Sequence, residues 1–150
     1  MGTPSVEITE DIPNRQRFPL EAHLERYIVD NFPAILGPRL ELLKDEQGNI
    51  IGKQYRTSNR VGRIDILAFE PETNSYVVVE LKKGRESDKV VGQILRYMGW
   101  VGEELCTENQ QVRGIIICGE PDEKLYYAVS ATQNIEIKYY QVELTLSNTP

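Results

Sequence analysis

Two strand-like segments of this chain each carry an acidic residue where an apolar residue would be expected. Segment 61–69 holds Asp65 and segment 75–82 holds Glu80, and both segments are otherwise rich in isoleucine, leucine or valine. Removing a charge from water costs several kcal/mol unless a partner compensates it. A fold built on these strands must therefore supply a compensating group. The two candidates are a divalent cation and the neighbouring Lys82.

The flanking segments predict a mixed sheet with helices on its faces, an α/β architecture. A turn-forming stretch at 70–74 joins the two acidic strands, which predicts an antiparallel hairpin. An apolar strand at 114–119 is reached through a helix at 87–105, so it is expected to lie parallel to 75–82. The remaining predicted elements are a helix at 19–31 that Pro33 ends, a helix at 122–130, and strands at 40–43, 50–55 and 135–146.

Helix 87–105 is expected to begin at a cap from Ser87 or Asp88. Its predicted buried face consists of apolar residues at helical spacing: Val90, Val91, Ile94, Leu95, Met98, Val101 and Leu105.

The length of 150 residues suits one domain with a substantial core. Residues 1–17 lack a periodic pattern and contain two prolines, which predicts a flexible arm before a single domain at 18–150. No apolar run approaches the roughly 18 residues that cross a bilayer, and the N-terminus has no secretory signal pattern. Cys106 and Cys118 are interpreted as reduced thiols. A cytoplasmic location is expected.

The net charge of −6 argues at first against a nucleic-acid partner, because phosphate binding needs a positive field. The charge is unevenly distributed, however. Residues 53–96 hold nine lysines and arginines against six acids, so this segment is positive while the rest of the chain is strongly negative. The distribution is compatible with a small phosphate-binding patch in the centre of the chain.

Residues two apart on a strand point to the same side, so Glu80 and Lys82 are expected to share one face. The hairpin would bring Asp65 close to Glu80, and neighbouring carboxylates need a shared proton or a divalent cation. Asp65, Glu80 and the Leu81 carbonyl could bind Mg²⁺, with Lys82 close to a metal-bound water. The structural alternative has no metal: Lys82 forms an ion pair with Glu80 or with Asp65.

The helix after these strands presents a polar face beside the acids. Gln93 and Tyr97 lie one turn apart, and Arg96 and Trp100 flank them. Gln93 could hydrogen-bond the acidic cluster or a water, and Tyr97 could reach a phosphate. An ordinary amphipathic surface explains the same residues equally well.

Together these motifs resemble the PD-(D/E)XK nuclease superfamily: Ile64-Asp65, then Glu80-Leu81-Lys82, then Gln93-x-x-x-Tyr97. The longer string over 62–97 is similar to the catalytic domain of NucS/EndoMS-type endonucleases. The resemblance implies a restriction-endonuclease-like fold with an αβββαβ core. It also implies a Mg²⁺-dependent (or Mn²⁺-dependent) DNA endonuclease that hydrolyses phosphodiester bonds.

The resemblance assigns roles to individual residues. Asp65, Glu80 and the Leu81 carbonyl would hold the metal, Lys82 would serve the attacking water, and Gln93 would support the site. An acid on the first helix often joins such sites, and Glu25 is the candidate, with Glu21 behind it. The predicted nucleic-acid contacts are Arg63, Lys83, Arg85, Arg96 and Tyr97, of which Tyr97 could instead brace Gln93.

The chain departs from the resemblance in two ways. Ile64 replaces the proline that gives the superfamily its name, and a short arm stands where NucS-like enzymes carry a DNA-binding, dimerising domain. A homodimer or a separate recognition partner is therefore expected to help grip DNA. Two alternatives stay open: a non-cleaving nucleic-acid-binding or assembly module, and a structural ion-pair cluster on the same fold.

Overall fold

The computed structural model describes residues 23–82, 87–141 and 146–148. Residues 23–30 are helical, and the elements that follow alternate between helices and strands. They are α2 (Phe32–Leu36), β1 (Glu41–Leu42), β2 (Lys53–Ser58), β3 (Gly62–Glu70), β4 (Ser75–Leu81), α3 (Ser87–Glu104), β5 (Gln111–Cys118), α4 (Glu123–Ser130) and β6 (Ile135–Tyr139).

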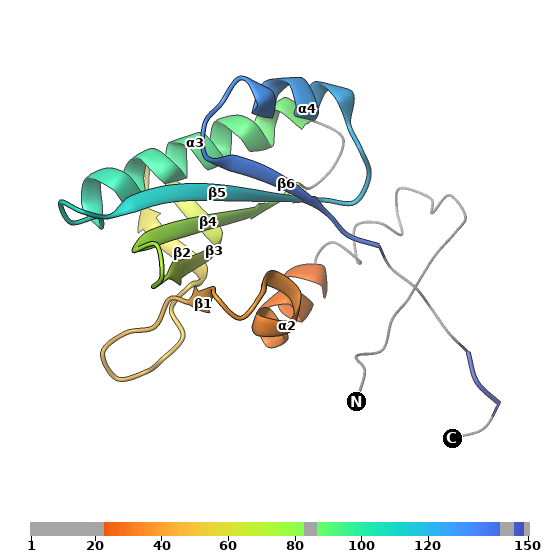
Figure 1. Cartoon of the computed structure of the whole chain (residues 1–150), viewed down its shortest axis with the longest axis horizontal. Coiled ribbons are helices and arrows are strands. Elements are labelled where there is room, and N and C mark those ends of the chain that lie inside the picture. The colour runs from red at the N-terminus through yellow and green to blue at the C-terminus, as the bar shows by residue number, and fades with distance from the viewer. Residues whose placement is uncertain (1–22, 83–86, 142–145, 149–150) are drawn as a thin grey trace.

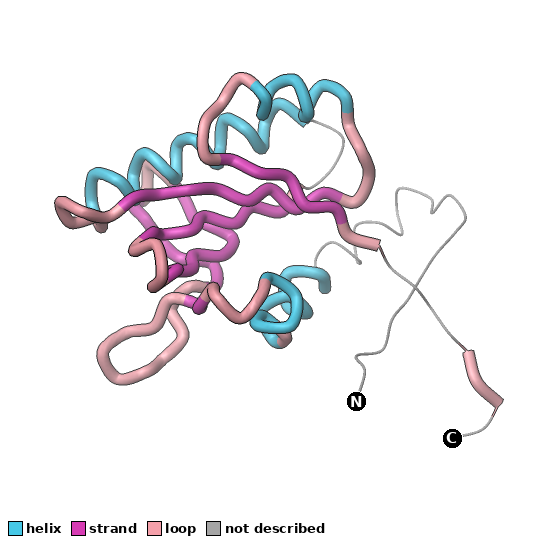
Figure 2. The backbone as a smooth tube through the Cα atoms, viewed as in Figure 1, coloured by secondary structure: helices cyan, strands magenta, loops and turns pink. Residues whose placement is uncertain are grey.

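The strands form one mixed sheet of six strands, as predicted (Figure 2). β3 and β4 are antiparallel, whereas β4, β5 and β6 run parallel to one another. The predicted parallel pairing of β5 with β4 through a crossover helix is confirmed. β1 and β2 both pair with β3, each along a different part of the same edge.

Helices cover both faces of this sheet, which gives three layers (Figure 1). α3 and α4 pack on one face, where Ile94 and Leu125 meet the fully buried Val78 and Ile116. The helical residues 23–30 and α2 cover the other face. There Ile28 and Phe32 pack against Val77, Val79 and Ile115. Consecutive residues of β4 thus supply opposite cores, as strand geometry requires.

Gly52 lies where β1 and β2 share the edge of β3. The Leu67 N–H donates to the Gly52 carbonyl at 2.7 Å, and the Gly52 N–H donates to the Leu43 carbonyl at 3.0 Å. A Cβ atom added at Gly52 would lie 2.1 Å from the Leu67 carbonyl oxygen. Any other residue would therefore push this segment away from β3.

The first half of the chain departs from the predicted elements at two places. The chain turns at Asn31, and Pro33 then lies in the first turn of α2, so Pro33 starts a second helix where it was predicted to end the first. The strand predicted at 50–55 is instead β2, three residues later. Ile50 forms only an isolated bridge with Lys44, and its side chain is exposed.

Two further predictions need correction in the second half. The last strand ends at Tyr139, short of the predicted 146, and part of the difference lies outside the described residues. Leu95 is 44% exposed, while Tyr97 takes a place on the buried face of α3. The arm at 1–17 and the capping side chains of Ser87 and Asp88 also lie outside what the structure describes. In the described part of the chain, no helix is long and apolar enough to span a membrane.

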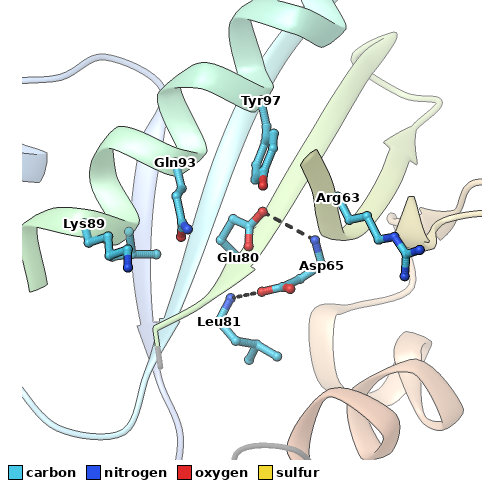
Figure 3. Close-up of a pocket in the computed structure, with 8 residues that line it drawn as sticks. Arg63, Asp65, Glu80, Leu81, Lys89, Gln93 and Tyr97 are labelled. Carbon is cyan, nitrogen blue, oxygen red and sulfur yellow. Dashed lines mark hydrogen bonds between the residues drawn. The ribbon is translucent and has the colours of Figure 1, made fainter. Parts of the chain in front are cut away.

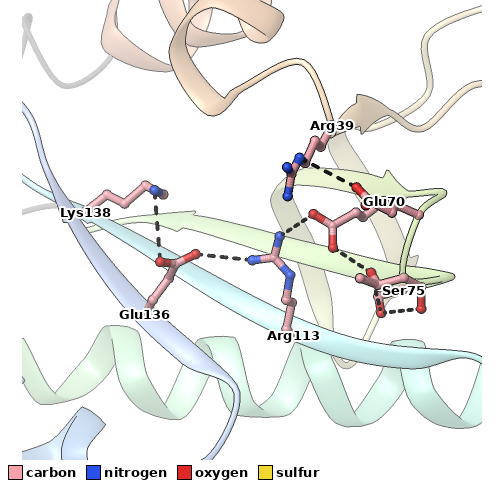
Figure 4. Close-up of polar contacts among 8 residues, drawn as sticks. Arg39, Glu70, Ser75, Arg113, Glu136 and Lys138 are labelled. Atoms are coloured by element: carbon pink, nitrogen blue, oxygen red, sulfur yellow. Dashed lines mark hydrogen bonds and ion pairs between the residues drawn. The ribbon is translucent and has the colours of Figure 1, made fainter.

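An ion-pair network ties the strands together at the end of β3 that holds Glu70 (Figure 4). The Arg113 guanidinium on β5 lies 3.1 Å from a Glu70 carboxylate oxygen and 3.2 Å from one of Glu136 on β6. The Thr73 hydroxyl and the Arg113 guanidinium hold the pKa of Glu70 below its ordinary value, against the opposing effect of burial. This network links β3, β5 and β6 by opposite charges.

Candidate active site

The candidate site begins where β3 and β4 stop pairing. The last paired residues are Ile66 and Val79, and beyond them side chains replace the backbone ladder (Figure 3). The Leu81 N–H donates to Asp65 Oδ2 at 2.9 Å, and the Asp65 N–H donates to Glu80 Oε1 at 3.4 Å. The two carboxylates therefore lie side by side, as the hairpin predicts. They are only 7% and 3% exposed.

A cavity of about 210 Å³ opens in front of these carboxylates. β3 and β4 form one wall, and α3 forms the other, with Gln93 pointing from the helix into the space (Figure 3). The lining residues are Arg63, Asp65, Glu80, Leu81, Lys89, Val90, Gln93 and Tyr97. The structure thus brings Gln93 to the predicted carboxylate pair, although its supporting role is still a prediction.

Tyr97 is more deeply placed than a simple DNA contact requires. Its side chain is 5% exposed and packs in the core under α3, with its hydroxyl end lining the cavity. The guanidinium of Arg96 lies 5.2 Å from the centre of its ring, on the exposed side of the helix. The hydroxyl also approaches Gly62, where a Cβ would lie 2.9 Å from it. This packing suits the bracing alternative, and a DNA contact by Tyr97 stays a prediction.

Gln54 connects two acids and was missed by sequence reasoning. Its Nε2 donates to both carboxylate oxygens of Glu25, at 2.8 and 2.9 Å, and lies 3.2 Å from Asp65 Oδ1. Its neighbours in β2 pair with the two residues that flank Asp65 in β3, so Gln54 lies directly across from Asp65. Its backbone has φ of 48°, a left-handed conformation that is uncommon outside glycine. No motif or period in the sequence marks it.

Glu25, the predicted acid of the first helix, is buried at 8% exposure and reaches Asp65 through Gln54. Glu21 lies outside the described residues. Among the residues that the structure describes, no three His, Cys, Asp or Glu side chains are grouped so as to hold a metal ion. The Asp65–Glu80 pair and the Leu81 carbonyl stay the predicted ligands of a cation. Such hard oxygen ligands suit Mg²⁺ or Mn²⁺, whose remaining positions water and substrate phosphate commonly fill.

Lys82 lies just past the end of β4 and is not one of the cavity-lining residues. Its Nζ is 3.8 Å from Asp122 Oδ2, and Asp122 also caps α4 by accepting the Leu125 N–H at 3.1 Å. The sequence contained no signal for this pairing, because Asp122 resembles an ordinary helix cap. Lys83 and Arg85, two predicted phosphate contacts, fall in 83–86, which the structure does not describe.

The two cysteines are both free, as expected. Burial raises the pKa of the Cys118 thiol, and the nearby Lys82 ammonium only partly opposes this effect. A buried thiol that keeps its proton is a poor nucleophile. The structure therefore gives no support to Cys118 as a nucleophile.

The sequence matches, over residues 11–150, the family described as the YhcG PDDEXK nuclease domain. The chain belongs to this family. The predicted membership of the PD-(D/E)XK superfamily is confirmed, and the carboxylate pair and cavity belong to a nuclease domain. No curated protein sequence matches the chain.

Two solved structures share the fold. One is a repair endonuclease from Pyrococcus abyssi, with 22% identity and a TM-score of 0.58, and the other is an EndoMS complex with double-stranded DNA, with 20% identity and a TM-score of 0.61. Both cover 91% of this chain, which spans only 50% and 49% of theirs. The predicted likeness to NucS/EndoMS-type enzymes is thus confirmed at the level of fold. The chain corresponds to about half the length of those proteins.

Proposed function

We propose that this chain is a divalent-metal-dependent endonuclease that hydrolyses phosphodiester bonds in DNA. The observation that carries the proposal is the pair of buried carboxylates, Asp65 and Glu80, at the point where β3 and β4 separate into a cavity. Two adjacent acids are destabilising without a cation or a shared proton, so this pair suits metal binding better than packing.

Asp65, Glu80 and the Leu81 carbonyl would hold Mg²⁺ or Mn²⁺. The bound cation would polarise the scissile phosphate and lower the pKa of water. The chain's own groups would do the rest. The Leu81 N–H and the Gln54 amide orient the Asp65 carboxylate. Gln93 would position water or phosphate from α3, and Lys82 would orient the attacking water or stabilise charge on the phosphate.

DNA is the proposed substrate, because the fold is shared with a structure solved in complex with double-stranded DNA. Arg63 lines the cavity and Arg96 is exposed on α3, which supports their assignment as phosphate contacts. A cut in both strands needs one site for each strand, so a homodimer, or a separate recognition partner, completes the proposal. A cytoplasmic location also stays a prediction.

A non-cleaving nucleic-acid-binding module is the second candidate. The ion pair between Lys82 and Asp122 favours it, because that contact draws the ammonium toward α4. A cleaving enzyme would have to use Lys82 from this position or after its side chain has moved.

Cleavage of single-stranded, double-stranded, branched and mismatched DNA in Mn²⁺ tests the proposal. We expect at least one substrate to be cut, and we expect Lys82→Ala to be much slower. Glu70→Gln is the control, because Glu70 lies on β3, the strand of Asp65, but outside the cavity, and its cleavage should equal that of the parent.

Calorimetric titration with Mn²⁺ separates the candidates further. The endonuclease proposal requires binding by the parent and weaker binding by Glu80→Gln. Failure to cut any of the four substrates, with nucleic-acid binding intact, would leave the binding module as the better description.

A further inference from the structure

The hairpin formed by β2 and β3 carries an unbroken set of positive charges. No acidic residue occurs between positions 47 and 64. The four cations of this hairpin, all exposed, are Lys53, Arg56, Arg60 and Arg63. We call the β2–β3 hairpin with these four residues the basic hairpin. The chain as a whole carries −6, so this concentration of positive charge is a local exception.

Two of these cations face each other across the hairpin. Arg56 in β2 and Arg63 in β3 are directly opposite in the antiparallel register. Like charges at such a position repel and destabilise the strand pair. A stretch selected only for folding would gain from an acid or a neutral residue at either place, so the pair points to an anionic ligand.

None of the four cations has an ion-pair partner within the described residues. The paired cations of the chain lie elsewhere, as with Arg113 beside Glu70 and Glu136, and Arg39 beside Glu72. The protein therefore neutralises arginines at the far end of β3 and leaves the basic hairpin exposed to solvent.

The basic hairpin is also continuous with the candidate active site. Arg63 lines the cavity and stands two residues before Asp65 on the same strand. Figure 3 shows its side chain leading away from Glu80 and α3, toward the outer side of the cavity. A ligand held by Arg63 and Arg56 would thus extend from the carboxylates along the hairpin.

We propose that the basic hairpin is a binding surface for the sugar-phosphate backbone of the DNA, on one side of the phosphodiester at Asp65 and Glu80. A phosphate between Arg56 and Arg63 converts their repulsion into two attractive contacts, and guanidinium groups bind phosphate oxygens in pairs. The surface would also offset the negative net charge that otherwise repels DNA. This inference rests on the proposed function and adds Lys53, Arg56 and Arg60 to its contacts.

Fluorescence anisotropy with a labelled duplex, measured without divalent metal over a range of salt concentrations, tests the surface. Each phosphate contact adds about 0.9 to the slope of log affinity against log salt. Arg56→Gln and Arg60→Gln should each raise the Kd several-fold. Each should also lower that slope by about 0.9, the contribution of one phosphate contact. Arg39→Gln is the matched control, an exposed arginine away from the site, and should bind as the parent does.

Thermal unfolding of the free protein gives an independent readout. Arg56→Gln should unfold at a higher temperature than the parent, because it relieves the repulsion with Arg63. Weaker DNA binding by a more stable protein is the expected signature. An Arg56→Gln/Arg60→Gln variant with the DNA affinity and salt slope of the parent would overturn the proposed binding surface. An equal loss of DNA affinity in Arg39→Gln would overturn it as well.

The proposed binding surface and the proposed endonuclease activity can be disproved separately. Normal cleavage kinetics in the double variant would overturn the surface and leave the endonuclease intact. A parent that binds DNA through these arginines but never cleaves it would support the surface and overturn the endonuclease. A parent that binds no DNA would overturn both.

Discussion

Strand β3 carries a buried or half-buried acid near each end of its pairing with β4, and the surroundings of the two acids differ. Glu70 contacts the guanidinium of Arg113, which also reaches Glu136 (Figure 4). Asp65 accepts hydrogen bonds from the Leu81 N–H and the Gln54 amide, and it lies beside a second acid, Glu80. One acid is held by a fixed opposite charge, while the other lines a cavity together with an acid.

The difference separates a structural ion pair from the proposed metal site. Arg113 occupies the space between two carboxylates, so the Glu70 end is complete without any ligand. At the Asp65 end, N–H donors set the direction of the carboxylate and the cavity leaves room for a cation. Substitutions at the Glu70 end should therefore change stability, and those at the Asp65 end should change metal binding and cleavage.

Asp65→Asn should have the largest effect. We expect cleavage to fall at least about 10²-fold, comparable with the loss of one preorganised charge-stabilising group. The amide can still accept the Leu81 N–H and no longer repels Glu80, but its NH2 group then meets the Gln54 amide donor, so urea unfolding without metal should stay within about 1 kcal/mol of the parent. A clear loss of stability with cleavage retained would contradict the distinction between the two ends.

Gln54→Ala should come next. Removal of a group that orients a metal ligand typically lowers affinity or activity by about 10–100-fold. We expect Mn²⁺ affinity, measured by calorimetry, to fall within that range. Gln54→Gly is the matched control for the left-handed backbone at φ 48°, because glycine relieves the strain without restoring the amide. Equal Mn²⁺ affinity in the parent and both variants would remove Gln54 from the site.

Arg113→Met should act on stability alone. The change leaves the half-buried Glu70 facing Glu136 without the guanidinium between them. We expect a loss of about 1–2 kcal/mol in urea unfolding, allowing for the partial exposure of the three side chains. Cleavage per folded molecule should stay at the parent level. A fall in cleavage would show that the two ends of β3 are coupled.

Acid should weaken the Glu70 end slightly. Since the folded protein lowers the pKa of Glu70, its contribution to stability is complete above the pKa of the unfolded chain and is lost as the pH falls through the folded value. The difference in unfolding free energy between the parent and Glu70→Gln should shrink by less than about 1 kcal/mol between neutral pH and about pH 3. A difference that grows in acid would reverse the assigned direction.

The long elements could be predicted because their patterns are local. The prediction of 75–82 differs from β4 by one residue, and α3 begins at the predicted Ser87. The strand at β2 was predicted three residues too early, because Ile50 and Ile51 suggest a strand. Its actual position depends on the hydrogen bond from the Leu67 N–H to the Gly52 carbonyl, between residues far apart in the sequence. No local pattern can report a contact made across the sheet.

The candidate site likewise contains residues that the sequence could predict and residues that it could not. Asp65 and Glu80 were predictable because each interrupts an apolar strand, and the hairpin brings them together. Gln54 was not, because its contact with Glu25 joins residues 29 positions apart through a left-handed backbone. The partner of Lys82 was missed for a similar reason, since Asp122 lies beyond β5 in the sequence and is brought to Lys82 only by the fold.

The hydrogen bond from the Leu81 N–H to Asp65 has a practical consequence. The Leu81 amide proton is hydrogen-bonded to a carboxylate, whereas the amide protons of neighbouring residues in β4 are hydrogen-bonded to peptide carbonyls. Its resonance in a nitrogen–proton correlation spectrum should therefore respond to Mg²⁺ more strongly than those of the neighbouring β4 amides. A single backbone signal would report the occupancy of the site with no substrate present.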